Sequence, residues 1–134
     1  SHAMLYVLDA SALLALIQNE RGSAVVDALL EDHECVASSV NVAEVGSKLA
    51  DKGLAPDEWR RLLHQMDVQA IDFDVEQAST SALLRATTRE LGLSLGDRAC
   101  LALARGMGAT AVTADRAWAD LNEAATGVHV QVIR

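Results

Sequence analysis

Short apolar runs alternate with longer amphipathic segments along most of the chain. Residues 5–8 form a continuous apolar run of strand length, and the following segment carries Leu13, Leu14 and Ile17 at helical spacing. A strand that is apolar at every position is typical of a sheet covered on both faces. The N-terminal segment therefore predicts a buried strand followed by a helix.

The same alternation continues to the C-terminus. Helices are predicted at 22–32, from Ser38 or Ser39 to about 53, from Pro56 to 66, at 74–91, from Ser94 to 106 or 108, and briefly after 115, and strands at 35–37, 68–73, 110–113 and 128–133. Such alternation favours an α/β fold: a mainly parallel sheet of about five strands flanked by helices on both faces.

Several residues mark the helix boundaries. Pro56 suits the first turn of a helix, and Gly92 is a predicted helix stop. Asp74 with Gln77, and Ser94 with Asp97, have the spacing of capping boxes. These signals predict where the helices of the second half begin and end.

The length of 134 residues fits one domain, expected to span residues 4–134. Residues 1–3 resemble an expression-tag remnant. No charged-then-apolar leader follows Met4, so we expect a cytoplasmic protein. The 51% hydrophobic content excludes disorder, and the absence of an 18-residue apolar run excludes a membrane span. Two cysteines, Cys35 and Cys100, lie in apolar surroundings and disfavour a disulfide scaffold or a zinc site.

The net charge is −8, from 11 basic and 19 acidic residues. A protein that coats nucleic acid electrostatically carries the opposite charge. The balance is compatible with an acidic metal site or with a basic protein partner.

Four acidic residues fall where a parallel sheet places its ligands. Asp9 and Asp115 follow predicted strands, and Glu44 and Asp97 lie in the first turns of predicted helices. Because ligands bind at the carboxyl ends of parallel strands, the four acids can converge on one pocket. Clustered carboxylates repel one another unless cations neutralise them, and oxygen ligands select Mg²⁺ or Mn²⁺.

Each acid also has an ordinary structural explanation. Asp9 and Asp115 suit helix caps, Asp97 suits the capping box with Ser94, and Glu44 suits a solvent-facing helix position. It is their combination at one edge that favours a metal site.

The sequences around these acids resemble the four motifs of the PIN-domain nucleases. The matching segments are VLDASALLA at 7–15, VAEV at 42–45, SLGDRACLALA at 94–104 and TADRAW at 113–118. Their order and spacing are similar to those of the VapC toxins of bacterial toxin–antitoxin pairs. The resemblance extends over residues 4–134 and implies a single PIN-like domain.

The resemblance implies that Asp9, Glu44, Asp97 and Asp115 bind one or two Mg²⁺ or Mn²⁺ ions. It also implies that Ser11 and Thr113 orient the ligands through hydrogen bonds. The implied activity is endoribonuclease hydrolysis of RNA by metal-activated water, leaving 5′-phosphate and 3′-hydroxyl ends. No histidine lies near the motifs, which fits metal-activated water better than histidine catalysis.

Two arginines and two kinds of protein partner are also part of the hypothesis. Arg98 and Arg116, each directly after a proposed ligand, are candidates for phosphate contacts, with surface ion pairs as the alternative. The resemblance implies a homodimer and an antitoxin whose basic tail enters the acidic groove. Helices carrying Val25, Leu29, Trp59 and Leu62 could supply a dimer face, although packing onto the sheet explains most of those residues.

Other classes of protein fit less well. A phospho-acceptor signalling domain would need a second acid after Asp9 and a lysine after the last strand, but Ala10 follows Asp9 and no lysine follows Lys52. Residues 92–96 match G-x-S-x-G, but a helix is predicted before Gly92 where a serine hydrolase needs a strand. A non-catalytic PIN-like scaffold is a further alternative, which the four intact acids disfavour.

Overall fold

The apolar runs of the sequence become the strands of one sheet in the computed structural model, which describes residues 4–134. All strand pairs are parallel, and the order across the sheet is β3-β2-β1-β4-β5. The strands are β1 (Leu5–Leu8), β2 (Glu34–Ser38), β3 (Gln69–Ile71), β4 (Thr110–Thr113) and β5 (Val130–Val132). The predicted five-stranded parallel sheet is confirmed, whereas the suggested tag remnant at 1–3 lies outside the described residues.

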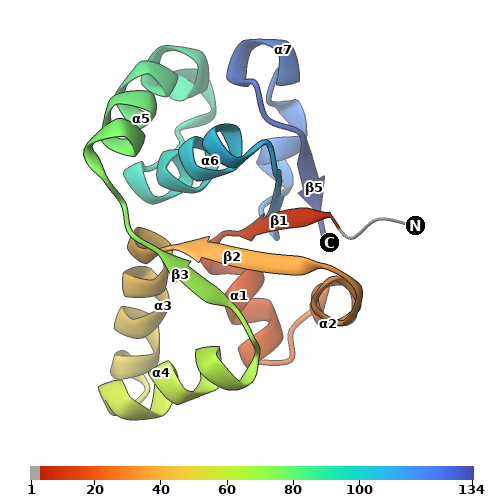
Figure 1. The fold of residues 1–134 in the computed structure, drawn as a ribbon, viewed down its shortest axis with the longest axis vertical. Coiled ribbons are helices and arrows are strands. Elements are labelled where there is room, and N and C mark those ends of the chain that lie inside the picture. Colours follow the sequence, from red (N-terminus) through yellow and green to blue (C-terminus); the bar gives the residue numbers. More distant parts are fainter. Residues whose placement is uncertain (1–3) are drawn as a thin grey trace.

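Helices connect the strands and cover both faces of the sheet (Figure 1). The α-helices are α1 (Ala10–Ile17), α2 (Ser23–Asp32), α3 (Ser39–Asp51), α4 (Pro56–Gln65), α5 (Val75–Thr88), α6 (Leu95–Met107) and α7 (Glu123–Thr126). Two 3₁₀ segments, η1 (Arg89–Leu91) and η2 (Arg116–Asp120), follow α5 and β4. Among residues 4–134, no helix has the length and apolarity needed to cross a membrane.

The alternation of side chains along β1 creates two apolar cores. Tyr6 and Leu8 pack with the helices of the first half of the chain, α1 to α4. Val7 points to the opposite face and packs with Leu84 of α5 and Leu101 of α6. Figure 1 shows the same division, with α1 to α4 on one side of the sheet and α5 and α6 on the other. A strand buried on both faces explains why residues 5–8 are apolar without alternation.

The order of the strands reverses beside β1. The chain runs from β1 outward to β2 and β3, and then returns to place β4 on the opposite side of β1. In open parallel sheets, the point where the order reverses is where ligands bind, at the carboxyl ends of the strands. Leu8 pairs with Val112, so Asp9 and Thr113, the next residues, lie side by side at this point.

Several predicted boundaries need correction. The helix expected at 74–91 is α-helical only to Thr88 and ends as η1. The Gln77 side chain donates to the Asp72 carbonyl oxygen, so the capping box expected with Asp74 is only half formed. The edge strands β3 and β5 are three residues long, half the predicted length, because each has a neighbour on one side only.

The region after β4 also differs in detail. The helix expected after Asp115 is the 3₁₀ segment η2, and α7 was not predicted. The signal for α7 was present, because the Asn122 side chain accepts from two N–H groups as an N-cap. Cys35 and Cys100 are free and buried in opposite cores, which confirms that the two cysteines form no disulfide.

Candidate metal centre at the carboxyl edge of the sheet

Asp9 lies directly after β1 and is 3% exposed. It is the N-cap of α1: its Oδ1 accepts from the backbone N–H of Ala12 at 2.8 Å and from the Ser11 hydroxyl at 2.7 Å. Its Oδ2 accepts from the Thr113 hydroxyl at 2.6 Å. The cap explanation is therefore correct, and three donors hold this buried carboxylate in a fixed orientation.

Ser11 and Thr113 form a small network around this carboxylate. Their hydroxyl oxygens lie 3.2 Å apart, although 102 residues separate them in the sequence. The N–H of Ala114 donates to Ser11 Oγ, and the N–H of Asp115 donates to Thr113 Oγ1. The two hydroxyls thus connect the end of β1 to the end of β4, as a group that orients a ligand should.

Glu44 is held by a residue that the sequence analysis did not single out. Asn41, 1% exposed, donates through Nδ2 to Glu44 Oε1 at 2.8 Å and to the Gly96 carbonyl oxygen at 3.0 Å. A methyl group on Gly96 would lie 2.6 Å from Glu44 Cδ, so glycine is what lets Glu44 keep this position. Asn41 therefore orients Glu44 and joins α3 to the first turn of α6.

Asp97 forms the predicted capping box at the start of α6. Its Oδ2 accepts from the Ser94 N–H at 2.9 Å, and the Asp97 N–H donates to Ser94 Oγ at 3.2 Å. Asp97 is half-buried, and its negative charge contributes to the raised pKa of Asp9. The cap thus holds a second carboxylate within electrostatic reach of Asp9.

Asp115 is the most exposed of the four acids. It follows β4 and caps η2, where its Oδ1 accepts from the Ala117 N–H at 3.0 Å. Its own N–H donates to Thr113 Oγ1, which in turn donates to Asp9. The backbone of Asp115 is therefore tied to the Asp9 network, while its side chain lies at the rim.

Burial dominates the electrostatics of the site. Burial raises the pKa of Asp9 from 3.8 to about 6, against the opposing hydrogen bonds from Thr113, Ser11 and Ala12. Burial also raises the pKa of the Cys100 thiol well above its usual value, and the charges of Asp9, Asp97 and Glu44 add to this effect. The negative charges of three carboxylates, at the end of β1 and in α3 and α6, thus act on one buried thiol.

The structure brings the predicted acids to one edge without closing them into a ligand shell. Within residues 4–134, no three Asp, Glu, His or Cys side chains form a ready metal-binding cluster. Each carboxylate is hydrogen-bonded within its own cap or turn. The arrangement is a set of separately held carboxylates near the carboxyl edge of the sheet.

The two arginines proposed for phosphate contact lie in different surroundings. Arg98 is half-buried, and its Nη1 donates to the Ser81 carbonyl oxygen at 2.9 Å, which joins α6 to α5. Arg116 is exposed at the start of η2. Of the two, Arg116 has the guanidinium accessible to a ligand.

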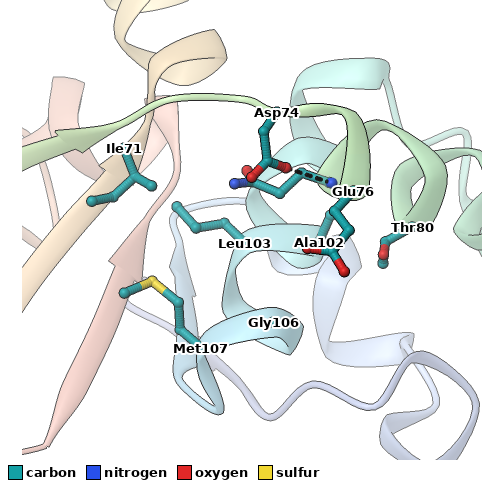
Figure 2. Close-up of a pocket in the computed structure, with 9 residues that line it drawn as sticks. Ile71, Asp74, Glu76, Thr80, Ala102, Leu103, Gly106 and Met107 are labelled. Atoms are coloured by element: carbon teal, nitrogen blue, oxygen red, sulfur yellow. Dashed lines mark hydrogen bonds between the residues drawn. The ribbon is translucent and has the colours of Figure 1, made fainter.

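A separate hollow lies away from this edge. It has a volume of about 370 Å³ between the first turns of α5 and the last turns of α6 (Figure 2). Gly106, in its lining, is nine residues beyond Asp97, about 13 Å along the helix axis. The hollow contains none of the residues predicted for the site, and its Asp74 is occupied as the cap of α5.

The five-stranded parallel sheet with helices on both faces, and a buried carboxylate with further acids at the point where the strand order reverses, define an α/β domain with an acidic edge. The sequence profile of the PIN domain matches residues 6–124, and the chain belongs to the PIN domain family. No curated protein matches the chain by sequence.

Solved structures share the fold at low identity. A chain of VapBC2 from Rickettsia felis, bound to a DNA fragment from its promoter, is 18% identical with a TM-score of 0.72, covering 98% of this chain and 100% of that one. A chain of DNA-bound VapBC from Salmonella typhimurium is 19% identical with a TM-score of 0.72, covering 98% and 99%. VapC20 of Mycobacterium tuberculosis, described as a sarcin–ricin loop cleaving toxin, is 15% identical with a TM-score of 0.69, covering 88% and 97%.

Proposed function

We propose that the chain is a divalent-metal-dependent endoribonuclease, the toxin of a toxin–antitoxin pair. The observation that carries this proposal is the Asp9 carboxylate, buried at the reversal point of the sheet and held by three donors. A buried charge persists only where a partner compensates it. In a PIN-family chain with further acids from α3, α6 and the end of β4 beside it, a divalent cation is the fitting partner.

The donor set fits Mg²⁺ or Mn²⁺. All four proposed ligands, Asp9, Glu44, Asp97 and Asp115, are carboxylates, the hard oxygen donors that these ions prefer. Among the described residues, Glu44 Oε2, Asp97 Oδ1 and Asp115 Oδ2 accept no hydrogen bond, and Asp9 Oδ2 accepts only one. Each acid thus uses part of its acceptor capacity to fix its orientation and keeps the rest for one or two ions.

The bound ion would supply an activated water and neutralise charge on the scissile phosphate. The protein's own part is positioning. Ser11 and Thr113 hold Asp9, Asn41 holds Glu44, and the Ser94 cap holds Asp97. The exposed Arg116 is placed to contact a phosphate oxygen, whereas Arg98, engaged with the Ser81 carbonyl, serves the contact between α5 and α6. The proposed products carry 5′-phosphate and 3′-hydroxyl ends.

The enzyme test is cleavage of RNA by the purified protein. We expect cleavage with Mg²⁺ or Mn²⁺, none with EDTA, and loss of activity in Asp9→Ala, with ends assigned by ligation and phosphatase treatment. Circular dichroism of Asp9→Ala would confirm that the variant is folded. Cleavage that persists in EDTA, or in Asp9→Ala, would contradict the mechanism.

The toxin assignment has support of two kinds. Similar folds occur in the VapBC complexes of Rickettsia felis and Salmonella typhimurium, and the net charge of −8 suits a basic inhibitory tail at the acidic edge. We expect expression of the wild-type chain in bacteria to arrest growth and expression of Asp9→Ala to leave growth unaffected. Equal growth with both chains would argue against a toxin. The proposal includes a cytoplasmic location, because the protein would encounter its RNA substrate and the antitoxin in the cytoplasm.

A homodimer is also part of this proposal, but the face suggested for it needs revision. Leu29 is buried, Trp59 and Leu62 are half-buried, and only Val25 is exposed, at 36%. Leu29 and Trp59 pack within the layer formed by α1 to α4, so they are not free to form a dimer face. Sedimentation velocity would establish the oligomeric state.

A further inference from the structure

A basic groove leads away from the acidic edge along α1. It has a volume of about 390 Å³ and is lined by Ser11, Leu14, Gln18, Glu20, Lys48, Lys52 and Arg134. Ser11 is the residue that donates to Asp9 Oδ1, so the groove begins where the Asp9 network ends. From Ser11 to Gln18 it follows α1 for about 10 Å.

The groove concentrates positive charge in an acidic protein. Lys48 and Lys52 are the only lysines in the chain, and both line this groove. They are exposed, and neither has an ion-pair or hydrogen-bond partner among residues 4–134. With Arg134 they make three cations against one acid, Glu20, on a chain whose net charge is −8.

The register of α3 aligns these lysines with the site. Glu44 and Lys48 are spaced by four residues and lie along one side of α3, and Lys52, four residues further on, is the C-cap residue of this helix. Along this side, the proposed metal ligand Glu44 is followed by two lysines that have no ion-pair partner among residues 4–134. An anionic chain whose reacting group lies at Glu44 would meet the two lysines as it continues along α3.

The opposite wall of the groove is fixed in place. Arg134 Nε donates to the Arg21 carbonyl oxygen at 2.8 Å, and its Nη2 lies 3.5 Å from Glu20 Oε1. These contacts hold the guanidinium in the lining that it shares with Lys48 and Lys52. The groove thus has one anchored cation and two exposed cations without an ion-pair partner among residues 4–134.

We propose that this groove binds the phosphodiester backbone of the RNA strand next to the scissile bond, with Lys48 and Lys52 as positioning residues. The inference rests on the ribonuclease function proposed above. It explains how a protein of net charge −8 can bind RNA: the affinity comes from a local track of cations rather than from a broad basic face.

The test compares Lys48→Ala/Lys52→Ala with the wild type in RNA cleavage at several salt concentrations. Each lost phosphate contact should reduce the slope of log affinity against log salt by about 0.7, so the double variant should lose about 1.4. We expect KM to rise roughly tenfold at low salt with kcat little changed, because the lysines touch the strand and not the reacting atoms.

Two control variants separate charge from structure. Lys48→Arg/Lys52→Arg keeps both cations and should keep the wild-type salt slope. Arg85→Ala/Arg89→Ala removes two exposed cations from α5 and η1, away from the groove, and should leave KM and the slope unchanged. A general effect of net charge would instead change KM equally in both alanine pairs.

The outcomes distinguish the two proposals. If the wild type cleaves RNA and Lys48→Ala/Lys52→Ala has the same KM and salt slope, the groove assignment is wrong and the ribonuclease function stands. If binding of an acidic peptide to Asp9→Asn depends on the lysines while RNA cleavage does not, the groove belongs to a protein partner. If the wild type cleaves no RNA under any metal condition, the proposed function fails, and the groove assignment fails with it.

Discussion

Asp9 carries a charge that its surroundings disfavour. The carboxylate is almost fully buried, and its pKa is raised to about 6 despite three hydrogen bonds. Buried groups with strongly shifted pKa values are candidates for function, and the function we propose for Asp9 is to bind a cation. The individual acids could be predicted from the sequence because each follows a strand or begins a helix. Asn41 and Gly96 could not, because their role depends on contact between α3 and α6, 55 residues apart.

Replacing Asp9 by asparagine should stabilise the metal-free protein at neutral pH. The folded protein binds the Asp9 proton up to about pH 6, and the unfolded chain releases it near 3.8. Between pH 3.8 and about pH 6 the folded state binds more protons than the unfolded chain does. The contribution of Asp9 to the free energy of unfolding therefore falls as the pH rises and stays low above pH 6. The full shift corresponds to about 3 kcal/mol. Asparagine carries no charge and therefore removes this loss of stability. Its side-chain oxygen can still accept the hydrogen bonds from Ser11 and Ala12. The Thr113 hydroxyl can rotate so that it accepts a hydrogen bond from the asparagine NH₂ group.

Urea unfolding of both proteins in EDTA at pH 4 and pH 7.5 measures this effect. We expect Asp9→Asn to be more stable by roughly 1–3 kcal/mol at pH 7.5 and nearly equal to the wild type at pH 4. A stability difference that does not change with pH would contradict the raised pKa. The same variant should have no RNA cleavage activity.

Gly96→Ala should damage the site more than the fold. The new methyl group would lie 2.6 Å from Glu44 Cδ, so the flexible glutamate must move away and its orientation by Asn41 is lost. We expect metal-dependent cleavage to fall at least roughly tenfold, as for a misplaced catalytic group, with little loss of stability. Gly106→Ala in the same helix is the matched control, because nothing lies within 4 Å of its added methyl group. The control should keep full activity and gain up to about 1 kcal/mol.

At the scale of elements, local signals explain most of the structure. Ser38, Asp74, Ser94 and Asp115 are N-caps at the predicted positions, and Gly92 ends η1 with a φ of 65°. The short edge strands and the division of residues 75–91 into α5 and η1 could not be predicted. The strand lengths depend on which strands have a neighbour, and the division of the helix depends on how α5 packs against α6. Neither property can be read from a short stretch of sequence.

Gly46→Ala should separate two helices rather than disturb the site. Gly46 lies in the interior of α3, where a methyl group would be 2.7 Å from Trp59 Cζ2 of α4. An indole ring packed against a helix cannot move as easily as the end of a glutamate, so overpacking should cost about 1–3 kcal/mol. We expect a lower urea midpoint and a change in Trp59 fluorescence. Both are measured in a Trp118→Phe background, in which Trp59 is the only tryptophan. A midpoint equal to that of the background protein would show that α4 is free to shift.

At the scale of the whole molecule, the strand order determines the site. Because β4 returns to the opposite side of β1, residues 104 positions apart, Asp9 and Thr113, come within hydrogen-bonding distance. The alternation of strands and helices predicted a parallel sheet with helices on both faces, but the order of its strands is a tertiary property. The distribution of charge is also a property of the whole fold. It places acids at the carboxyl edge of the sheet and the only two lysines in the adjoining groove.

The central claim is that the carboxylates at the ends of β1 and β4, of Glu44 in the second turn of α3 and of Asp97 in the first turn of α6 bind a divalent cation. Titration of Mn²⁺, followed by electron paramagnetic resonance, tests this most directly on wild type, Asp9→Asn and, as a matched control, Asp27→Asn in α2. We expect one or two bound ions in the wild type and in Asp27→Asn, and greatly weakened binding in Asp9→Asn. Equal binding by all three proteins, or none by the wild type, would contradict the account.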